Sequence, residues 1–265
     1  MIMLGYFLAI LVGVSLGLIG SGGSILTVPI LVYIMGINPV LATAYSLFIV
    51  GSTSLIGGIQ NLKNKNADIK TVLIFGLPSI FAVYLTRAYL LPAIPEELWT
   101  LPSFALTKNI ALMLLFAVVM IGSSLSMILP SPGKKSSKRE ILSYNYPLIL
   151  TEGLLVGVLT GLVGAGGGFL IIPALVILAK MPMKLAIGTS LLIIAIKSLL
   201  GFAGDLQTNQ AIDWKTLLIF TFLSIIGIFF GGLISQKVEG DKLKKGFGFF
   251  VLLMGIYIIA KELFF

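Results

Sequence analysis

The chain contains two copies of one glycine-rich segment, 144 positions apart. The first copy reads GVSLGLIGSGGSILTVP over residues 13–29 and the second reads GVLTGLVGAGGGFLIIP over residues 157–173, with nine of seventeen positions identical and no gap. In each copy, consecutive glycines interrupt an apolar stretch. Paired interruptions at corresponding points of two hydrophobic halves are typical of the binding site of a membrane transporter. The duplication therefore predicts a binding site at residues 20–23 and 164–168.

The composition places the chain in a lipid bilayer. Of its 265 residues, 58% are hydrophobic and 11% are charged, whereas a soluble domain has about 45–50% apolar and about 25% charged residues. The mean hydropathy is +1.11. We therefore expect an all-α polytopic membrane protein. Full-length spans are predicted at residues 42–59, 69–90, 105–129, 185–203, 214–236 and 246–262.

The residue types that the chain lacks disfavour several kinds of chemistry. It has no Cys and no His, so we expect no disulfide, no thiolate metal site, no histidine proton relay and no cofactor. The net charge of +8 comes from short basic clusters between apolar segments, which indicates topology determinants and no nucleic-acid partner. The N-terminal MIMLGYFLAILVG lacks a basic region, so it reads as part of the first span and not as a cleaved signal.

The repeat extends beyond the glycines. Ser46 and Ser54 correspond to Ser190 and Ser198 at the same offset, and the pattern continues after one added residue. Each repeat is expected to hold a glycine-broken helical hairpin and three transmembrane helices. We predict a first membrane repeat over residues 1–130, a basic cytoplasmic linker over residues 131–145 and a second membrane repeat over residues 146–265.

Charge placement predicts how the repeats are oriented. If each glycine-broken stretch crossed the membrane once, the basic residues near loops would divide nine against eight. If each stretch leaves and returns on one side, the division becomes thirteen against four, the asymmetry of a cytoplasmic face. We therefore expect a plasma-membrane protein with both termini outside and with inverted repeats. The thirteen are Lys63, Lys65, Lys70, Lys134, Lys135, Lys138, Arg139, Lys180, Lys184, Lys237, Lys242, Lys244 and Lys245, and the four are Arg87, Lys108, Lys215 and Lys261.

The glycine motifs can attract an anion through the backbone. Short helices are predicted at residues 24–35 and 169–179, directly after the glycines, and the free amides and dipole of a helix N-terminus favour negative charge. The alternative is that the glycines only allow close helix packing, as Gly13 and Gly17 can. Packing alone explains neither the consecutive glycines nor their duplication. The predicted substrate-binding residues are Gly20, Ser21, Gly22, Gly23, Ser24, Thr53, Gly164, Ala165, Gly166, Gly167, Gly168, Ser190 and Lys197.

Lys197 is the one ionisable side chain well inside a predicted span, and its repeat counterpart is Thr53. A buried cation in a membrane is costly and usually functional, and beside two helix N-termini it favours an anionic substrate. The alternative is snorkelling, since Lys197 lies about two turns from Asp205. Glu152 and Arg87 are either interfacial or in contact with substrate or a coupling ion. Asp68 and Asp213 are predicted N-terminal helix caps.

At these residues the chain resembles the sulfite exporter TauE/SafE family over essentially its whole length. The resemblance rests on the glycine segments ending in Pro29 and Pro173, on AIGTSL at residues 186–191, and on its degenerate copy ATAYSL at residues 42–47. It implies a plasma-membrane transporter that moves sulfur-containing anions such as sulfite, sulfonates or sulfoacetate-like compounds, usually outward. The first half departs from the family pattern at Ser21, Ser24, Ala44 and Tyr45, which leaves the substrate open.

The leading hypothesis is a secondary transporter that exports a small sulfur-containing anion by alternating access, without ATP. An anion channel, a transporter of another small organic anion and a subunit of a larger assembly are the alternatives. A membrane-embedded enzyme is disfavoured because few intramembrane groups can act as general acid or base. The coupling ion, H⁺ at Glu152 or Na⁺ at unwound carbonyls, and assembly as a homo-oligomer are left open.

Overall fold

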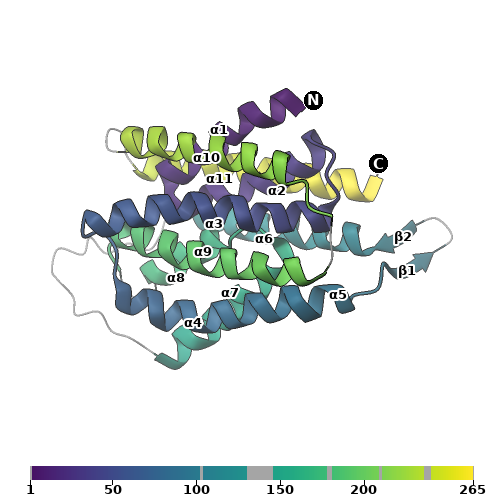
Figure 1. Ribbon diagram of the computed structural model, residues 1–265, viewed down its shortest axis with the longest axis horizontal. Helices are drawn as coiled ribbons and strands as arrows, with labels where there is room; N and C mark the ends of the chain where they lie inside the picture. Colours follow the sequence, from purple (N-terminus) through teal and green to yellow (C-terminus); the bar gives the residue numbers. More distant parts are fainter. Residues whose placement is uncertain are drawn as a thin grey trace.

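The computed structural model describes residues 2–101, 104–129, 146–177, 181–208, 211–235 and 240–264, so the predicted linker at residues 131–145 lies outside it. The fold is a bundle of helices along one long axis, with a β-hairpin at one end (Figure 1). The helical elements are α1 (Ile2–Ile19), η1 (Gly20–Leu26), α2 (Thr27–Pro29), η2 (Ile30–Ile34), α3 (Pro39–Lys63), α4 (Ile69–Leu85), η3 (Thr86–Leu90), α5 (Leu91–Ala93), α6 (Lys108–Ile128), α7 (Tyr146–Val163), α8 (Gly168–Ile177), α9 (Met183–Asp205), η4 (Leu206–Thr208), α10 (Trp214–Ser235) and α11 (Gly240–Phe264).

Five helices in the described residues are long and apolar enough to cross a membrane. They are α3, the continuous segment from α4 through α5, α6, α9 and α10. The sixth predicted span falls within α11, whose first turns carry GDKLKK and which is not among the five. The chain is thus a mostly helical polytopic membrane protein, as the composition predicts.

A two-stranded antiparallel hairpin departs from the predicted all-α fold. Strand β1 (Glu97–Leu101) pairs with β2 (Phe104–Thr107), with Trp99 opposite Leu106. Aromatic and threonine residues favour strands, and the prolines before this segment prevent α4 and α5 from continuing into it. The span predicted to begin at residue 105 therefore begins at Lys108, where the Thr107 side chain accepts a hydrogen bond from the Ile110 amide.

The short helix predicted at residues 24–35 is present over Ser24–Ile34, but its hydrogen-bond pattern changes along its length. A 3₁₀-helix, η1, follows α1 directly, and the chain then passes through one α-turn into the π-helix η2. Pro29 lies at the transition because it has no amide to donate to Ile25, so the α-helical pattern is interrupted. In the second repeat the break is a true turn, and α8 begins at Gly168, close to the predicted residue 169.

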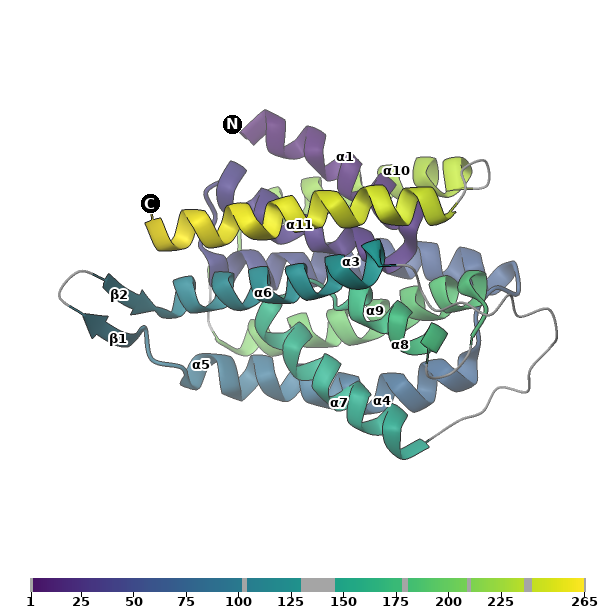
Figure 2. The same cartoon turned by 180° about the vertical axis from the view of Figure 1, so that it is seen from behind.

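Each glycine-broken stretch leaves and returns to one end of the bundle. Gly5 lies against Met35, and Tyr33 donates a hydrogen bond to Glu262 at 2.8 Å, so both chain termini share one end, which we call the terminus end (Figure 2). At the opposite end α3 finishes and α4, α7 and α9 begin, and the Asp68 amide donates to Thr189. We call this the lysine end, because its exposed residues include Lys63, Lys65, Lys70, Lys184 and Lys245.

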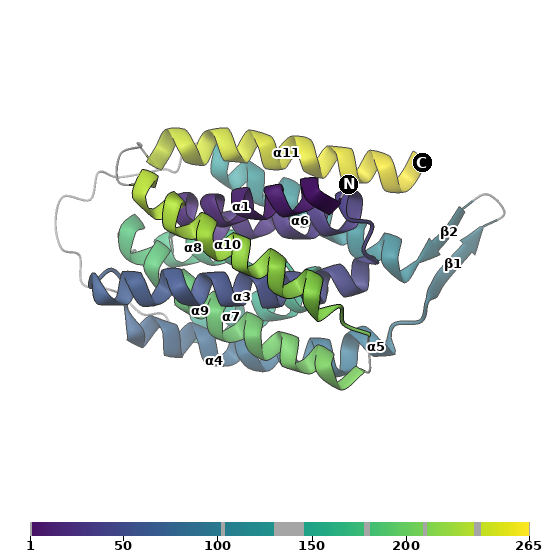
Figure 3. The same ribbon diagram turned by 45° about the horizontal axis from the view of Figure 1, so that its top comes forward.

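The helices of the two repeats are paired with each other, and equivalent helices run antiparallel. Gly51 of α3 lies against Leu199 of α9, and Gly58 lies against Leu192. Residue numbers therefore increase along α3 in the direction in which they decrease along α9, so the two helices are antiparallel. The equivalent helices α6 and α11 also run antiparallel (Figure 3). Each of the three buried apolar clusters draws side chains from both repeats.

Two further helix pairs cross at small residues in matching ways. An added Cβ on Gly13 of α1 would overlap the Ser224 carbonyl of α10. In the other repeat, an added Cβ on Gly157 of α7 would lie 2.6 Å from the Ser79 carbonyl oxygen of α4. Gly13 corresponds to Gly157 and Ser224 to Ser79, so one crossing occurs twice with the repeats exchanged. These glycines have the packing role that small-xxx-small patterns predict.

The predicted helix caps are confirmed. Asp68 accepts hydrogen bonds from the Thr71 amide and hydroxyl, and Asp213 accepts from the Thr216 amide and hydroxyl. Asn38 caps α3 by accepting from the Val40 amide at 2.9 Å. These side chains satisfy amides that helix N-termini leave unpaired. They fix where α3, α4 and α10 begin.

Candidate functional site

The centre of the bundle lies where α3 crosses its own repeat counterpart, α9. Along this antiparallel pair, Gly51 is level with Leu199 and Gly58 with Leu192. In both pairs the residue numbers add up to 250, whereas repeat counterparts differ by 144. Only Thr53 and Lys197 meet both conditions, so Thr53 lies opposite its own counterpart. At 1.5 Å per residue, Lys197 lies roughly 21 Å from the start of α9 and roughly 12 Å from its end. Lys197 therefore lies near mid-depth, where α3 and α9 cross.

Lys197 is buried inside the protein. Its side chain has 0% relative exposure, and Nζ donates to Thr160 Oγ1 of α7 at 3.0 Å. Within the described residues no carboxylate pairs with this ammonium. The snorkelling alternative is wrong, because the side chain does not reach the surface. An isolated buried charge costs several kcal/mol, so a counter-ion at this position would be strongly stabilising.

The second glycine break lies directly beside this ammonium. Gly164, Gly166 and Gly167 have φ of +73°, +66° and +62°, values that side-chain-bearing residues rarely adopt. A Cβ added to Gly167 would lie 2.8 Å from Lys197 Nζ and would overlap Thr160 Oγ1. The glycines thus allow the backbone to approach the ammonium closely. Residues 165–168 lead into α8, whose N-terminal dipole adds to the positive potential.

Buried hydroxyl groups flank the ammonium. Ser198 Oγ lies 3.6 Å from the Cβ position of Gly166, and neither Ser198 nor its counterpart Ser54 has a hydrogen-bond partner for Oγ in the described structure. Serine in a helix can bond to a preceding carbonyl, as Thr53 and Ser190 do here with Ile49 and Ile187. The Ser54 and Ser198 hydroxyls can therefore form a hydrogen bond with a ligand.

A small recess adjoins the ammonium on the α7 side. It has no room for a water molecule, and Thr160 and Gly167, which lie next to the ammonium, are among its lining residues. The lining residues are Val119, Leu159, Thr160, Val163, Ala165, Gly167 and Leu170.

The first glycine break is built differently from the second. Gly20 has φ of +72° and packs against Ile187 of α9, and Ser24 is buried. The backbone of Ser21, Gly22 and Gly23 lies within the 3₁₀-helix η1. The structure thus brings Gly166 and Gly167 together with Lys197, whereas the first-repeat glycines form no comparable turn. The two breaks therefore differ in form, since a 3₁₀-helix stands in the first repeat where the second has a turn before α8.

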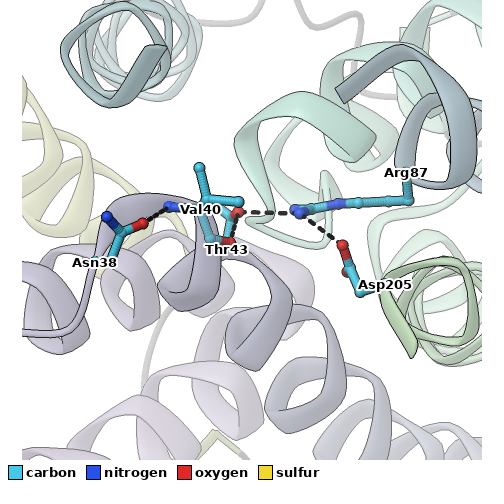
Figure 4. A network of polar contacts seen from close by, with 5 residues as sticks. All are labelled: Asn38, Val40, Thr43, Arg87 and Asp205. Atoms are coloured by element: carbon cyan, nitrogen blue, oxygen red, sulfur yellow. Dashed lines mark hydrogen bonds and ion pairs between the residues drawn. The ribbon is translucent and has the colours of Figure 1, made fainter. Parts of the chain in front are cut away.

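Figure 4 shows a second polar cluster, formed by Arg87, Thr43 and Asp205. It lies toward the terminus end, where α3 begins and α9 ends. Arg87 Nη1 donates to Thr43 Oγ1 at 3.0 Å and lies 3.3 Å from Asp205 Oδ1. All three side chains are at most 2% exposed. They come from η3, α3 and α9, so the cluster joins the two repeats. The sequence left Arg87 either at the membrane interface or in contact with substrate or a coupling ion. Its full burial argues against an exposed interfacial side chain. Glu152 of α7 is half-buried.

The comparison with known proteins agrees with this architecture. The model of the family "Sulfite exporter TauE/SafE" matches residues 6–258. The chain belongs to the TauE/SafE family. It is 33% identical to a probable membrane transporter protein of Methanocaldococcus jannaschii over 95% of this chain and 94% of the relative. The identity is 28% to a probable membrane transporter protein of Xylella fastidiosa (95% and 92% covered) and 25% to the probable membrane transporter protein YunE of Bacillus subtilis (97% and 97%). No solved structure matches the chain.

This TauE/SafE member has two polar contacts that reading the repeat alone missed. Thr160 holds the Lys197 ammonium, and Asp205 pairs with Arg87. Their repeat counterparts are Leu16 and Asn61. Comparing the two copies for positions where one is more polar than the other would have found both. No group of three or more metal-ligating side chains occurs in the described residues.

Proposed function

We propose that this TauE/SafE protein is a secondary transporter that exports small sulfur-containing anions such as sulfite, sulfonates or sulfoacetate. The observation that carries the proposal is the buried Lys197 ammonium, which has no carboxylate partner in the described residues. An oxyanion there would supply the counter-charge and accept hydrogen bonds from Lys197 and from the Ser198 hydroxyl. The start of α8 adds a favourable dipole.

The mechanism we propose is alternating access between two inverted repeats. Its support is that α3 runs antiparallel to its counterpart α9, with Lys197 level with Thr53 at the crossing. A site on the axis between exchangeable halves can be reached from either side by equivalent motions. We place the lysine end in the cytoplasm and both termini outside the plasma membrane, because the exposed lysines gather at that end.

An anion channel could use the same donors. The recess beside Thr160 and Gly167 admits no water molecule, which fits both a transporter and a closed channel. Reconstitution into liposomes separates the two. A transporter gives saturable flux that depends on a gradient of H⁺ or Na⁺, whereas a channel gives a current that follows the anion gradient alone.

The first test measures anion binding through thermal stability. A ligand that binds only the folded protein stabilises it by about 2.7 kcal/mol at a concentration of 100 times Kd. We expect one sulfur oxyanion among sulfite, sulfate, thiosulfate, sulfoacetate and taurine to raise the Tm of the detergent-purified protein, with chloride as reference. Lys197→Met should lose the response, and Lys215→Met, at an exposed position, should keep it. An equal response in Lys197→Met, or none in the native protein, would refute the proposed site.

A further inference from the structure

The Arg87 guanidinium has nitrogen donors without a hydrogen-bond partner in the described structure. Arg87 is fully buried, and its contacts with Thr43 and Asp205 both involve Nη1. In the described structure Nε and Nη2 have no hydrogen-bond partner. A guanidinium offers five N–H donors in a planar fork that suits two oxygens of one oxyanion. The fork therefore retains its capacity for a second, oxygen-rich ligand.

The ion pair with Asp205 is a single contact. One carboxylate oxygen lies 3.3 Å from Nη1, longer than the 2.7–2.9 Å of a strong charge-assisted bond. Thr43 Oγ1 also donates to the Val40 carbonyl at 2.7 Å, which fixes its lone pairs toward Arg87. Arg87 is thus positioned by α3, and its contact with Asp205 uses one nitrogen and one carboxylate oxygen.

The Arg87 cluster is connected to the proposed anion site through the glycine break. Thr43 packs directly against Gly164, the first residue of the break, and Gly167 lies beside Lys197. These glycines are three positions apart, which is at most about 11 Å of chain. Two buried cations therefore lie at the two ends of one short turn, with Arg87 nearer the terminus end.

The cluster has no charged counterpart at the lysine end. The repeat counterparts of Arg87, Asp205 and Thr43 are Gly232, Asn61 and Ile187. Asn61 packs against Gly188 near the end of α3, where it donates to the Gly57 carbonyl. The duplicated scaffold therefore forms without an ion pair at this place. The pair occurs at one end only, which favours a role beyond holding the helices together.

We propose that Arg87 is a second binding site for the transported oxyanion, on the terminus-end side of the glycine break, and that Asp205 occupies it when this end is closed. This inference rests on the proposed transport function. The Asp205 carboxylate stands in for the anion, and opening the end exchanges one for the other. The anion then passes between Arg87 and Lys197, and each site binds it weakly enough to release it.

The decisive variants carry Lys197→Met, which removes the first site. We expect Lys197→Met/Asp205→Asn to regain stabilisation by sulfate or sulfite, because the competing carboxylate is gone. Adding Arg87→Gln should abolish the gain. Lys197→Met/Asp213→Asn is the matched control: it removes an exposed carboxylate at the same end and should stay unresponsive. In the native background Asp205→Asn should bind the anion about tenfold more tightly, since the site is no longer partly occupied.

Two outcomes would overturn the inference: no anion response in Lys197→Met/Asp205→Asn, or a response that survives Arg87→Gln. With either outcome, the native protein can still be stabilised by the anion while Lys197→Met is not. The proposed function then stands and the second site fails. If only the Asp205→Asn variants respond, the second site stands and the Lys197 site fails.

A buried unpaired arginine can prevent folding, so the Asp205→Asn protein is also purified with and without sulfate. Recovery with sulfate and loss after exchange into gluconate supports an anion on Arg87. Failure in both buffers, while Arg87→Gln/Asp205→Asn folds in both, overturns it.

Discussion

Among single residues, Gly167 couples the backbone of the break most directly to the buried ammonium. Its φ of +62° and its closeness to Thr160 and Lys197 each exclude a side chain. By contrast, Gly76 in α4 has open space where a Cβ would lie. The two glycines form a natural comparison between a site position and an ordinary helix position.

We predict that Gly167→Ala abolishes anion-dependent stabilisation and lowers stability by about 1–3 kcal/mol, because the new methyl overlaps Thr160 and strains φ. Gly76→Ala should keep the anion response and raise stability by up to about 1 kcal/mol, as alanine favours helix. Thermal unfolding with and without sulfite measures both. A full anion response in Gly167→Ala would mean that the break does not shape the site.

The sequence predicts Lys197 and the second glycine break as candidate site residues, because a charge and consecutive glycines are conspicuous in an apolar chain. Thr160 and Asp205 could not be chosen the same way. A threonine inside a span usually bonds to its own helix, and an aspartate at a helix end reads as interfacial. Only the packing of α7 and α4 against α9 shows which cation each one contacts.

Among the elements, the crossings of α1 with α10 and of α7 with α4 depend on glycine at the contact. Gly13 and Gly157 each face a backbone carbonyl of the partner helix. We predict that Gly13→Ala and Gly157→Ala each lower stability by about 1–3 kcal/mol, because the helices must separate to admit a methyl. Gly122→Ala in α6, where nothing lies within 4 Å, is the control and should be neutral or stabilising. Melting curves in detergent that rank Gly122→Ala lowest would contradict this.

The start of α10 makes stability depend on pH. The Thr216 hydroxyl, followed by the backbone amides of Thr216 and Lys215, lowers the pKa of Asp213 below its usual value. Because the pKa is lower in the folded state, the cap stabilises above about pH 3.9, the unfolded value, and this is lost as pH falls through the folded value. Asp213→Asn should therefore melt below the native protein at neutral pH, and the gap should close in acid. A gap unchanged down to pH values below the folded pKa would exclude the charge as its cause.

The lengths and positions of α3, α9 and α10 follow from apolar runs between polar caps, and the sequence predicts them well. The 3₁₀-helix η1 and the hairpin β1–β2 do not follow in the same way. Three glycines and two serines at residues 20–24 are compatible with either a turn or a tight helix. In the structure this segment is a 3₁₀-helix, and Gly20 at its start lies against Ile187 of the other repeat.

For the molecule as a whole, the arrangement of the two ends predicts a labelling pattern. The chain has no Cys, so Lys63→Cys at the lysine end and Lys215→Cys at the terminus end each introduce one thiol. With the lysine end in the cytoplasm, a membrane-impermeant maleimide should label Lys215→Cys on intact cells and Lys63→Cys only after permeabilisation. The reverse pattern would invert the proposed orientation, and labelling of both from outside would refute the two-ended arrangement.

The crossing of α3 and α9 also restricts how such a protein can arise from a shorter ancestor. Two identical half-chains paired around this axis would place the same side chain at both central positions, so a lysine there would face a second lysine at the same depth in a membrane. Repulsion between two buried ammonium groups would oppose that pairing. In the joined chain the two central positions differ, Thr53 in one half and Lys197 in the other, so only one ammonium lies there. A symmetric dimer of identical halves could not hold a single lysine at this place.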